Sequence, residues 1–262
     1  MLTITHDARG LATLTMDRPD ARNALSSALV ARLTDALAEL ASNRSVRIVA
    51  LTGAGKVFCA GADIGEMRAA GQASPGQNEA DSRRFATLLE RLENQPQPTF
   101  AIVNGAAYGG ALGLISACDI ALAAASAHFA LSEVRLGLVP AMISPYVIRA
   151  IGARQAHRWF LTGETMDAST ALRIGLVHES VEDAALTDAT GRLVDALLAG
   201  SPEAQIEVKQ LLRHVTGRST AGDQAMLTDT AKWIARVRAG AEAAEGLAAF
   251  LEKRRARWRN PD

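Results

Sequence analysis

The stretch TFAIVNGAAYGGALGLISACDIALA, residues 99–123, decides the fold class. Its first five residues, Thr99–Val103, form a short apolar run that predicts a buried strand. The glycine-rich loop 104–110 follows, the apolar segment Ala111–Cys118 predicts a helix, and Asp119–Ala123 predicts another strand. Strands and helices that alternate in this way favour an α/β fold in which helices cover both faces of the sheet.

The residues before this stretch continue the same alternation. Leu2–Met16 predicts two strands around a turn at Asp7–Gly10, because apolar and polar residues alternate on both sides of the turn. Leucines at helical spacing then predict a helix, with Ser26 or Ser27 as its N-cap. The apolar run Val46–Leu51 predicts a further buried strand.

Two other regions lack strand patterns. Arg68–Asp81 is rich in Gly, Ala, Ser and Gln around Pro75, which predicts a mobile surface loop. Beyond Asp183, helical patterns run to the C-terminus with breaks at 200–202 and 217–222. We therefore expect the C-terminal quarter to be helical.

The composition excludes several classes of protein. The 28 basic and 28 acidic side chains balance to a net charge of +0, so the chain has no overall attraction for nucleic acid. The N-terminus resembles no signal peptide, and no apolar run is long enough to span a bilayer. Cys59 and Cys118 are far apart, and no two histidines stand four residues apart, so neither a disulfide framework nor a helix-borne metal site is expected. We expect a cytoplasmic protein that binds no metal, membrane or nucleic acid.

Two turns of small residues suggest how the chain binds a ligand. Cys59–Ile64 and Tyr108–Gly113 each follow a predicted strand and precede a predicted helix. Small residues allow a ligand to approach the main chain, and the N–H groups in the first turn of a helix are free to bind an anion. Either turn alone could simply allow close helix-sheet packing. Two such N–H groups that converge on one oxygen would form an oxyanion hole.

Six segments, in order along the chain, resemble the enoyl-CoA hydratase/isomerase (crotonase) family. They are Met16–Leu25, Phe58–Ile64, Asn104–Gly110, Cys118–Ile120, Phe129–Pro140 and Glu245–Arg254. The resemblance spans nearly the whole chain. It implies a spiral of ββα units over residues 1–195, which would carry the CoA and acyl site, and a helical oligomerisation region over 196–262. It also implies a homotrimer or a dimer of trimers.

The resemblance assigns roles to individual residues. It implies that the N–H groups of Ala62 and Ala111 polarise a thioester carbonyl while Glu133 transfers the proton. No separate cofactor is expected, because CoA is part of the acyl-CoA substrate. The residues expected to contact CoA are Ala21, Arg22, Ala60, Ala62, Ile64, Phe250 and Lys253. Of these, Phe250 and Lys253 are expected to help close a neighbouring CoA pocket.

One position departs from the family's two-carboxylate pattern. Hydratases of this type carry a second glutamate where this chain has Gly113. The stretch Leu136–Ile148 nevertheless resembles bacterial 3-methylglutaconyl-CoA and isohexenylglutaconyl-CoA hydratases. We therefore expect hydration of an enoyl-CoA, with isomerisation by Glu133 alone as the rival and non-catalytic acyl-CoA binding as a third reading.

Substrates of the glutaconyl type carry a second carboxylate. Arg135, Arg149 and Arg154 are the candidate partners for that charge. Each of them is also of a kind commonly found at the protein surface or in structural ion pairs.

Overall fold

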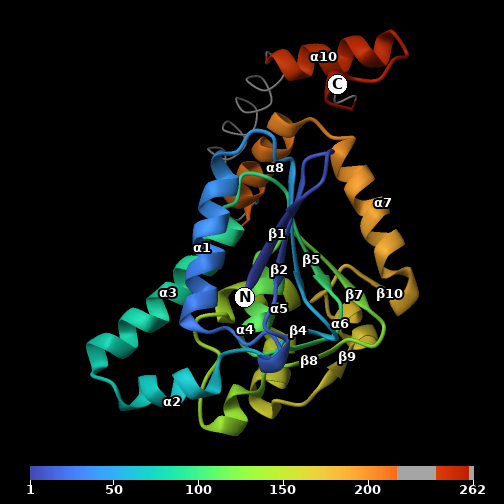
Figure 1. Ribbon diagram of the computed structural model, residues 1–262. Helices are drawn as coiled ribbons and strands as arrows, with labels where there is room; N and C mark the ends of the chain where they lie inside the picture. The colour runs from blue at the N-terminus through green and yellow to red at the C-terminus, as the bar shows by residue number, and fades with distance from the viewer. Residues whose placement is uncertain (217–239, 260–262) are drawn as a thin grey trace, which may run out of the picture.

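The computed structural model describes residues 1–216 and 240–259, and its strands form two sheets (Figure 1). The large sheet has the order β1-β2-β3-β5-β7-β10, with strands β1 (Leu2–His6), β2 (Leu11–Met16), β3 (Ile48–Gly53), β5 (Thr99–Val103), β7 (Ile120–Ala124) and β10 (Glu179–Val181). The small sheet has the order β4-β6-β8-β9, with strands β4 (Val57–Cys59), β6 (Ala106–Tyr108), β8 (His128–Ala130) and β9 (Met166–Asp167). Only the pairs β1–β2 and β8–β9 are antiparallel among these strands.

The helices complete a spiral. The α-helices are α1 (Ser27–Ser42), α2 (Ile64–Gln72), α3 (Pro75–Glu93), α4 (Gly110–Ala117), α5 (Ser144–Thr162), α6 (Ala168–Arg173), α7 (Leu186–Leu198), α8 (Pro202–Val215) and α10 (Ala241–Leu251). The short 3-10 helices are η1 (Pro19–Ala21), η2 (Ser132–Leu136), η3 (Asp183–Ala185) and η4 (Arg257–Arg259). In β3-β4-α2, β5-β6-α4 and β7-β8-α5, each turn of the chain adds one strand to each sheet and then a helix. This arrangement confirms the predicted α/β spiral of ββα units.

Local sequence signals placed several elements correctly. Ser26 is the N-cap of α1, and its hydroxyl accepts a hydrogen bond from the Leu29 N–H at 3.2 Å. The break predicted at 200–202 separates α7 from α8, and Ser201 caps α8. The break predicted at 217–222 lies outside the described residues. The loop predicted over 104–110 contains the short strand β6.

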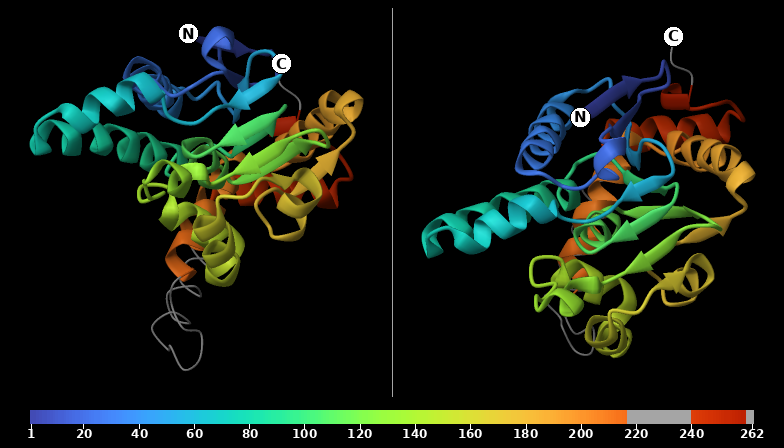
Figure 2. Two further views of the ribbon diagram at one scale, coloured as in Figure 1. Left: turned by 90° about the horizontal axis from the view of Figure 1, so that it is seen from below. Right: turned by 60° about the horizontal axis from the view of Figure 1, so that its bottom comes forward.

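The prediction of a surface loop over Arg68–Asp81 is wrong. The segment belongs to α2 and α3, which project from the side of the body (Figure 2). A capping box explains the second helix, because the Gln77 N–H donates to the Ser74 hydroxyl and the Ser74 N–H donates to the Gln77 side chain. Pro75 follows as the first helical residue, where its missing N–H costs nothing. Proline and serine, which suggested a loop, here start a helix.

Helices cover both faces of the large sheet, with α1 and α7 on opposite sides (Figure 1). The face toward α1 joins the main core, which includes Leu14 and Leu33. On the other face, Val194 of α7 packs with Ile48, Ala50 and Phe100. The alternation of buried residues along β3 thus fills two separate cores. No helix in the described part of the chain is apolar enough over a sufficient length to cross a membrane.

The helical C-terminal region begins beside the core. Lys209 of α8 donates to the Gln97 carbonyl at 3.0 Å and to Asp119 Oδ2 at 2.5 Å. Arg47, just before β3, donates to the carbonyls of Trp258 and Gly200. The C-terminal segment therefore lies at the amino end of the parallel strands, where Figure 1 shows α10. That residues 196–262 serve oligomerisation stays a prediction.

Candidate active site

Three parallel strands of the small sheet end at one edge and carry the predicted site residues there. The turn 60–63 follows β4, the turn at Gly109 follows β6, and η2 with Glu133 follows β8. The first two turns touch, because a Cβ placed on Gly61 would lie 2.7 Å from the Tyr108 carbonyl oxygen. Gly61 also has a φ of +90°, a conformation that other residues rarely adopt. The fold therefore brings together two turns that are about 50 residues apart in sequence.

The first turn leaves the Ala62 N–H available. Its neighbours are occupied, since the Ala60 N–H donates to the Arg22 carbonyl at 3.0 Å and the Gly61 N–H donates to Cys59 Sγ at 3.4 Å. The Asp63 N–H donates to the Leu25 carbonyl at 3.2 Å. Among the hydrogen bonds of the described residues, the Ala62 N–H has no acceptor.

The second turn supplies a matching donor. Ala111 is the second residue of α4, so its N–H has no acceptor within the helix. Within residues 1–216 and 240–259 no other acceptor reaches it. The positive end of the helix dipole adds to its attraction for an anion. Ala62 and Ala111 thus have the free N–H groups that an oxyanion hole requires.

Glu133 lies directly against the second turn. A Cβ placed on Gly109 would lie 3.2 Å from Glu133 Oε1, so any larger residue at 109 would press on the carboxyl group. Glu133 Oε2 is buried and has no hydrogen-bond partner among the described residues. Desolvation by burial raises the pKa of Glu133 above its usual value. A partly buried carboxyl group with one oxygen free of hydrogen bonds and a raised pKa is suited to proton transfer.

Polar residues of the N-terminal loop hold the first turn in place. Arg18 forms a 3.1 Å ion pair with Asp63, which also caps α2. The hydrogen bond from Arg18 is the largest cause of a lowered pKa at Asp63. Asn23, fully buried, donates to the carbonyls of Ala54 and Val57. These side chains fix the path of the backbone through Ala62.

The residues predicted to contact CoA fall into two groups. The hydrogen bond from the Ala60 N–H to the Arg22 carbonyl and the bridge between Leu25 and Ala62 bring the loop with Ala21 and Arg22 to the first turn. Arg22 is exposed and has a φ of +51°. Ile64, the first residue of α2, is 63% exposed. All these residues lie at the same edge of the molecule.

Phe250 and Lys253 lie elsewhere. Phe250 is in α10 and the exposed Lys253 follows it, at the opposite end of the strands from α4 and β4 (Figure 1). Within one chain they do not join the Ala62 turn. That Phe250 and Lys253 close the pocket of a neighbouring chain stays a prediction.

Apolar residues that the sequence did not single out complete the surroundings. A Cβ on Gly110 would lie 3.2 Å from both Leu25 Cδ1 and Phe85 Cζ. A Cβ on Gly113 would lie 2.3 Å from Ile143 Cγ2. Gly113 therefore faces a space that Ile143 already fills. In the sequence, the glycine itself was the only sign of this close packing.

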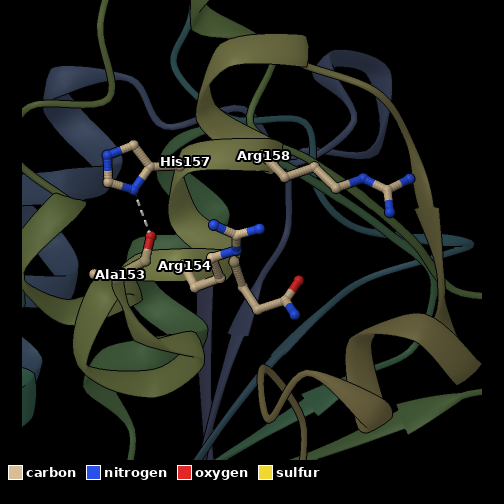
Figure 3. Close-up of a pocket in the computed structure, with 5 residues that line it drawn as sticks. Ala153, Arg154, His157 and Arg158 are labelled. Atoms are coloured by element: carbon tan, nitrogen blue, oxygen red, sulfur yellow. Dashed lines mark hydrogen bonds between the residues drawn. The ribbon is translucent and has the colours of Figure 1, made fainter.

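A pocket on α5 offers no alternative site. Its lining residues all belong to that helix: Ala153, Arg154, Gln155, His157 and Arg158. Figure 3 shows that the side chains of His157 and Arg158 point in opposite directions. His157 Nδ1 is 2.8 Å from the Ala153 carbonyl oxygen, and Arg158 pairs with Glu164 at 2.6 Å. In the described parts of the chain, no cluster of three or more His, Cys, Asp or Glu residues could hold a metal ion.

Known proteins share both the sequence and the fold. A model of the enoyl-CoA hydratase/isomerase family matches residues 6–261. The chain belongs to this family. A crystal structure of an enoyl-CoA hydratase from Shewanella pealeana superposes with a TM-score of 0.93 at 42% identity, covering 98% of this chain and 95% of that one. The family match supports the resemblance first seen in six separate segments.

Two relatives from this family carry more specific names. The 2,3-dehydroadipyl-CoA hydratase of Escherichia coli is 33% identical over 242 residues, which are 92% of each protein. The short-chain-enoyl-CoA hydratase of Clostridium acetobutylicum is 34% identical over 208 residues, which are 77% of each protein. The enzymes of the family to which this chain is similar thus include hydratases named for different acyl groups.

Proposed function

We propose that this protein is an enoyl-CoA hydratase in which Glu133 is the single acid and base. The observation that carries the proposal is the position of Glu133, whose Oε2 is buried without a hydrogen-bond partner and whose carboxyl group lies against Gly109, at the start of the helix that carries the free N–H of Ala111. A thioester carbonyl at the Ala62 and Ala111 N–H groups would place its C2 and C3 atoms near this carboxyl group. The hydratase names of the relatives support the same reaction.

In the proposed reaction every proton passes through Glu133. The ionised carboxyl takes a proton from water as the water oxygen bonds to C3 and the C2–C3 double-bond electrons move toward the carbonyl. The resulting enolate oxygen accepts hydrogen bonds from the N–H groups of Ala62 and Ala111, which stabilise the charge as it develops. Protonated Glu133 then gives its proton to C2, which restores the carbonyl and the carboxylate.

Isomerisation is the second candidate, and the packing at Gly113 is the observation that favours it. Ile143 fills the space beside Gly113, so no second carboxyl group stands there to hold water. Glu133 alone could remove a proton from one carbon of an enoyl chain and return it to another. The two reactions share the enolate and differ only in whether water adds.

The proposal also covers the kind of acyl group that is bound and the assembly of the chains. Arg149, one candidate partner for a second substrate carboxylate, forms an ion pair with Glu93 and stacks on the Tyr146 ring. Its charge is therefore already balanced, which makes Arg149 a poor partner for a second substrate carboxylate and leaves Arg135 and Arg154 as the candidates for a glutaconyl-type acyl group. The CoA moiety would lie along Ala21, Arg22, Ala60 and Ile64. Phe250 and Lys253 would close the pocket of a neighbouring chain in a trimer or a dimer of trimers.

The test is a panel of enoyl-CoA thioesters followed by mass spectrometry and chromatography. The panel includes 2-enoyl, 3-enoyl and glutaconyl-type thioesters. Gain of one water by the 2-enoyl substrates supports the hydratase. Movement of the double bond without mass gain supports the isomerase, and binding without any change supports a non-catalytic acyl-CoA-binding protein.

Glu133→Gln tests the mechanism within the same panel. We expect turnover to fall by at least about 100-fold, because general acid-base catalysis contributes about that much or more. Glu179→Gln is the matched control, since Glu179 is half-buried on β10, away from the candidate site, and pairs with Arg192. Full activity in Glu133→Gln would remove Glu133 from the mechanism.

A further inference from the structure

The first turn of α4 is surrounded by side chains from four other segments. Glu133 lies at Gly109, Leu25 and Phe85 lie at Gly110, and Leu89 and Ile143 lie at Gly113. Glu133 is the only charged side chain among these contacts. The other side chains that meet this turn are therefore apolar groups from α3, from the loop before α1 and from Ile143, the N-cap of α5.

Ile143 is buried and packs closely against α4. It is 2% exposed, and its Cγ2 and Cβ would lie 2.3 and 3.0 Å from a Cβ placed on Gly113. Gly109 and Gly113 are four residues apart, so they are separated by about one turn, roughly 5 Å, along α4. Glu133 and Ile143 thus contact the same helix one turn apart, with Ile143 deeper in the molecule.

We propose that Ile143 determines acyl-chain length by closing the inner end of the acyl pocket. The inference rests on the proposed function, which puts C2 and C3 of the acyl group at Glu133. An acyl chain that continues along α4 from that point would meet Ile143 within one helical turn. Short chains end before Ile143, whereas longer chains collide with its side chain.

Variants of Ile143 test this role directly. Ile143→Val removes one methyl group while retaining the contact with Gly113, and Ile143→Ala opens a larger space. Ile148→Ala is the control, because Ile148 lies in α5, the helix that Ile143 caps, and is 39% exposed. The kcat/KM values for crotonyl-CoA, hexenoyl-CoA and octenoyl-CoA are compared for each protein, and thermal melting confirms that each is folded.

We expect the ratio of kcat/KM for octenoyl-CoA to that for crotonyl-CoA to rise on the order of ten-fold in Ile143→Ala, because small changes in an apolar pocket shift discrimination by this amount. Ile143→Val should move the ratio in the same direction by less, and Ile148→Ala should leave it unchanged. A purely structural residue would lower all rates together. Unchanged ratios in both folded Ile143 variants would overturn the proposal, and Ile143→Val keeps the test decisive if Ile143→Ala does not fold.

A binding measurement separates this inference from the proposed reaction. Butyryl-CoA and octanoyl-CoA are saturated and cannot be hydrated, so calorimetric titration reports only pocket length. Ile143→Ala should strengthen octanoyl-CoA binding relative to butyryl-CoA even if no enoyl-CoA is turned over. Turnover without a shift in either ratio would reject the role of Ile143 while retaining the enzyme.

Discussion

Gly113 and Ile143 pack so closely that the helix α4 has no room for a side chain at position 113, since a Cβ there would lie 2.3 Å from Ile143 Cγ2. Ile143 is buried and begins the turn into α5, so it has little freedom to move aside. This contact fixes the spacing of α4 and α5 next to Glu133. Glycine at 113 is therefore required by packing.

Gly113→Ala should destabilise the protein despite the better helix propensity of alanine. We expect the free energy of unfolding to fall by about 1–3 kcal/mol, because overpacking a filled core costs this much. Gly191→Ala on α7 is the matched control, since a Cβ there meets nothing within 4 Å. It should be neutral or stabilise by up to about 1 kcal/mol. Urea unfolding of both variants checks the pair, and equal effects would contradict the packing argument.

The raised pKa of Glu133 predicts how stability depends on pH. Burial raises the pKa in the folded state above that in the unfolded state, so the contribution of Glu133 to stability is fully present below the unfolded pKa. That contribution is lost as the pH rises through the folded pKa. Glu133→Gln carries no charge and should melt at or above the parent's temperature at neutral pH. The difference in melting temperature between the two proteins should shrink as the pH falls toward the ordinary glutamate pKa of about 4.3.

The same shift sets the acid limb of activity. In the proposed mechanism hydration begins with ionised Glu133, so kcat/KM should fall as the pH drops through the raised pKa of this residue. We expect the midpoint of the limb above about 4.3, the ordinary value. A pH profile of kcat/KM measures it, and a midpoint below the ordinary value would show that the carboxyl is stabilised in its charged form.

The ion pair of Arg18 with Asp63 should position the Ala62 N–H. Asp63→Ala removes both the pair and the N-cap of α2, and loss of a cap costs about 1 kcal/mol. Asp167→Ala removes the N-cap of α6, where Asp167 accepts from the Thr170 N–H at 2.8 Å. Both variants should lose similar stability, but only Asp63→Ala should lower kcat/KM. Equal activity in the two variants would show that Asp63 serves only as a helix cap.

Local patterns were sufficient to predict much of the fold and the positions of the two turns. The strands at Leu2–Met16 and Thr99–Val103 alternate or cluster apolar residues, and Ser26 caps a helix with its own hydroxyl. Such signals depend on residues a few positions apart, so they can be recognised in a single sequence. The same reasoning failed at Arg68–Asp81, because proline and serine occur both in loops and at the start of helices.

The surroundings of Glu133 could not be predicted in this way. Phe85 and Ile143 meet α4 through contacts between segments that are far apart in the chain, and no local pattern specifies them. The resemblance identified Glu133, but the burial that raises its pKa depends on the packed structure. Local patterns also did not show that α10, which precedes Lys253, lies at the opposite end of the strands from α4 and β4 (Figure 1).

The ion pair between Lys209 and Asp119 should contribute strongly to the attachment of α8 to the core. The ammonium group of Lys209 is almost fully buried and binds Asp119, whose Oδ2 also accepts from the N–H and hydroxyl of Thr99. Lys209→Met should lower the free energy of unfolding by about 2 kcal/mol or more, because it leaves a charged carboxylate without its partner. Urea unfolding measures the loss.

Two further variants distinguish the effect of breaking this buried ion pair from the effect of losing a charge at the surface. Arg192→Met breaks an exposed pair with Glu179 and should change stability by less than about 1 kcal/mol. Lys209→Met with Asp119→Asn removes both charges and should recover part of the loss, since an uncharged amide costs less to leave unpaired. If the double variant were less stable than Lys209→Met alone, the hydrogen bonds of Asp119 to Thr99, rather than its charge, would be what holds this junction.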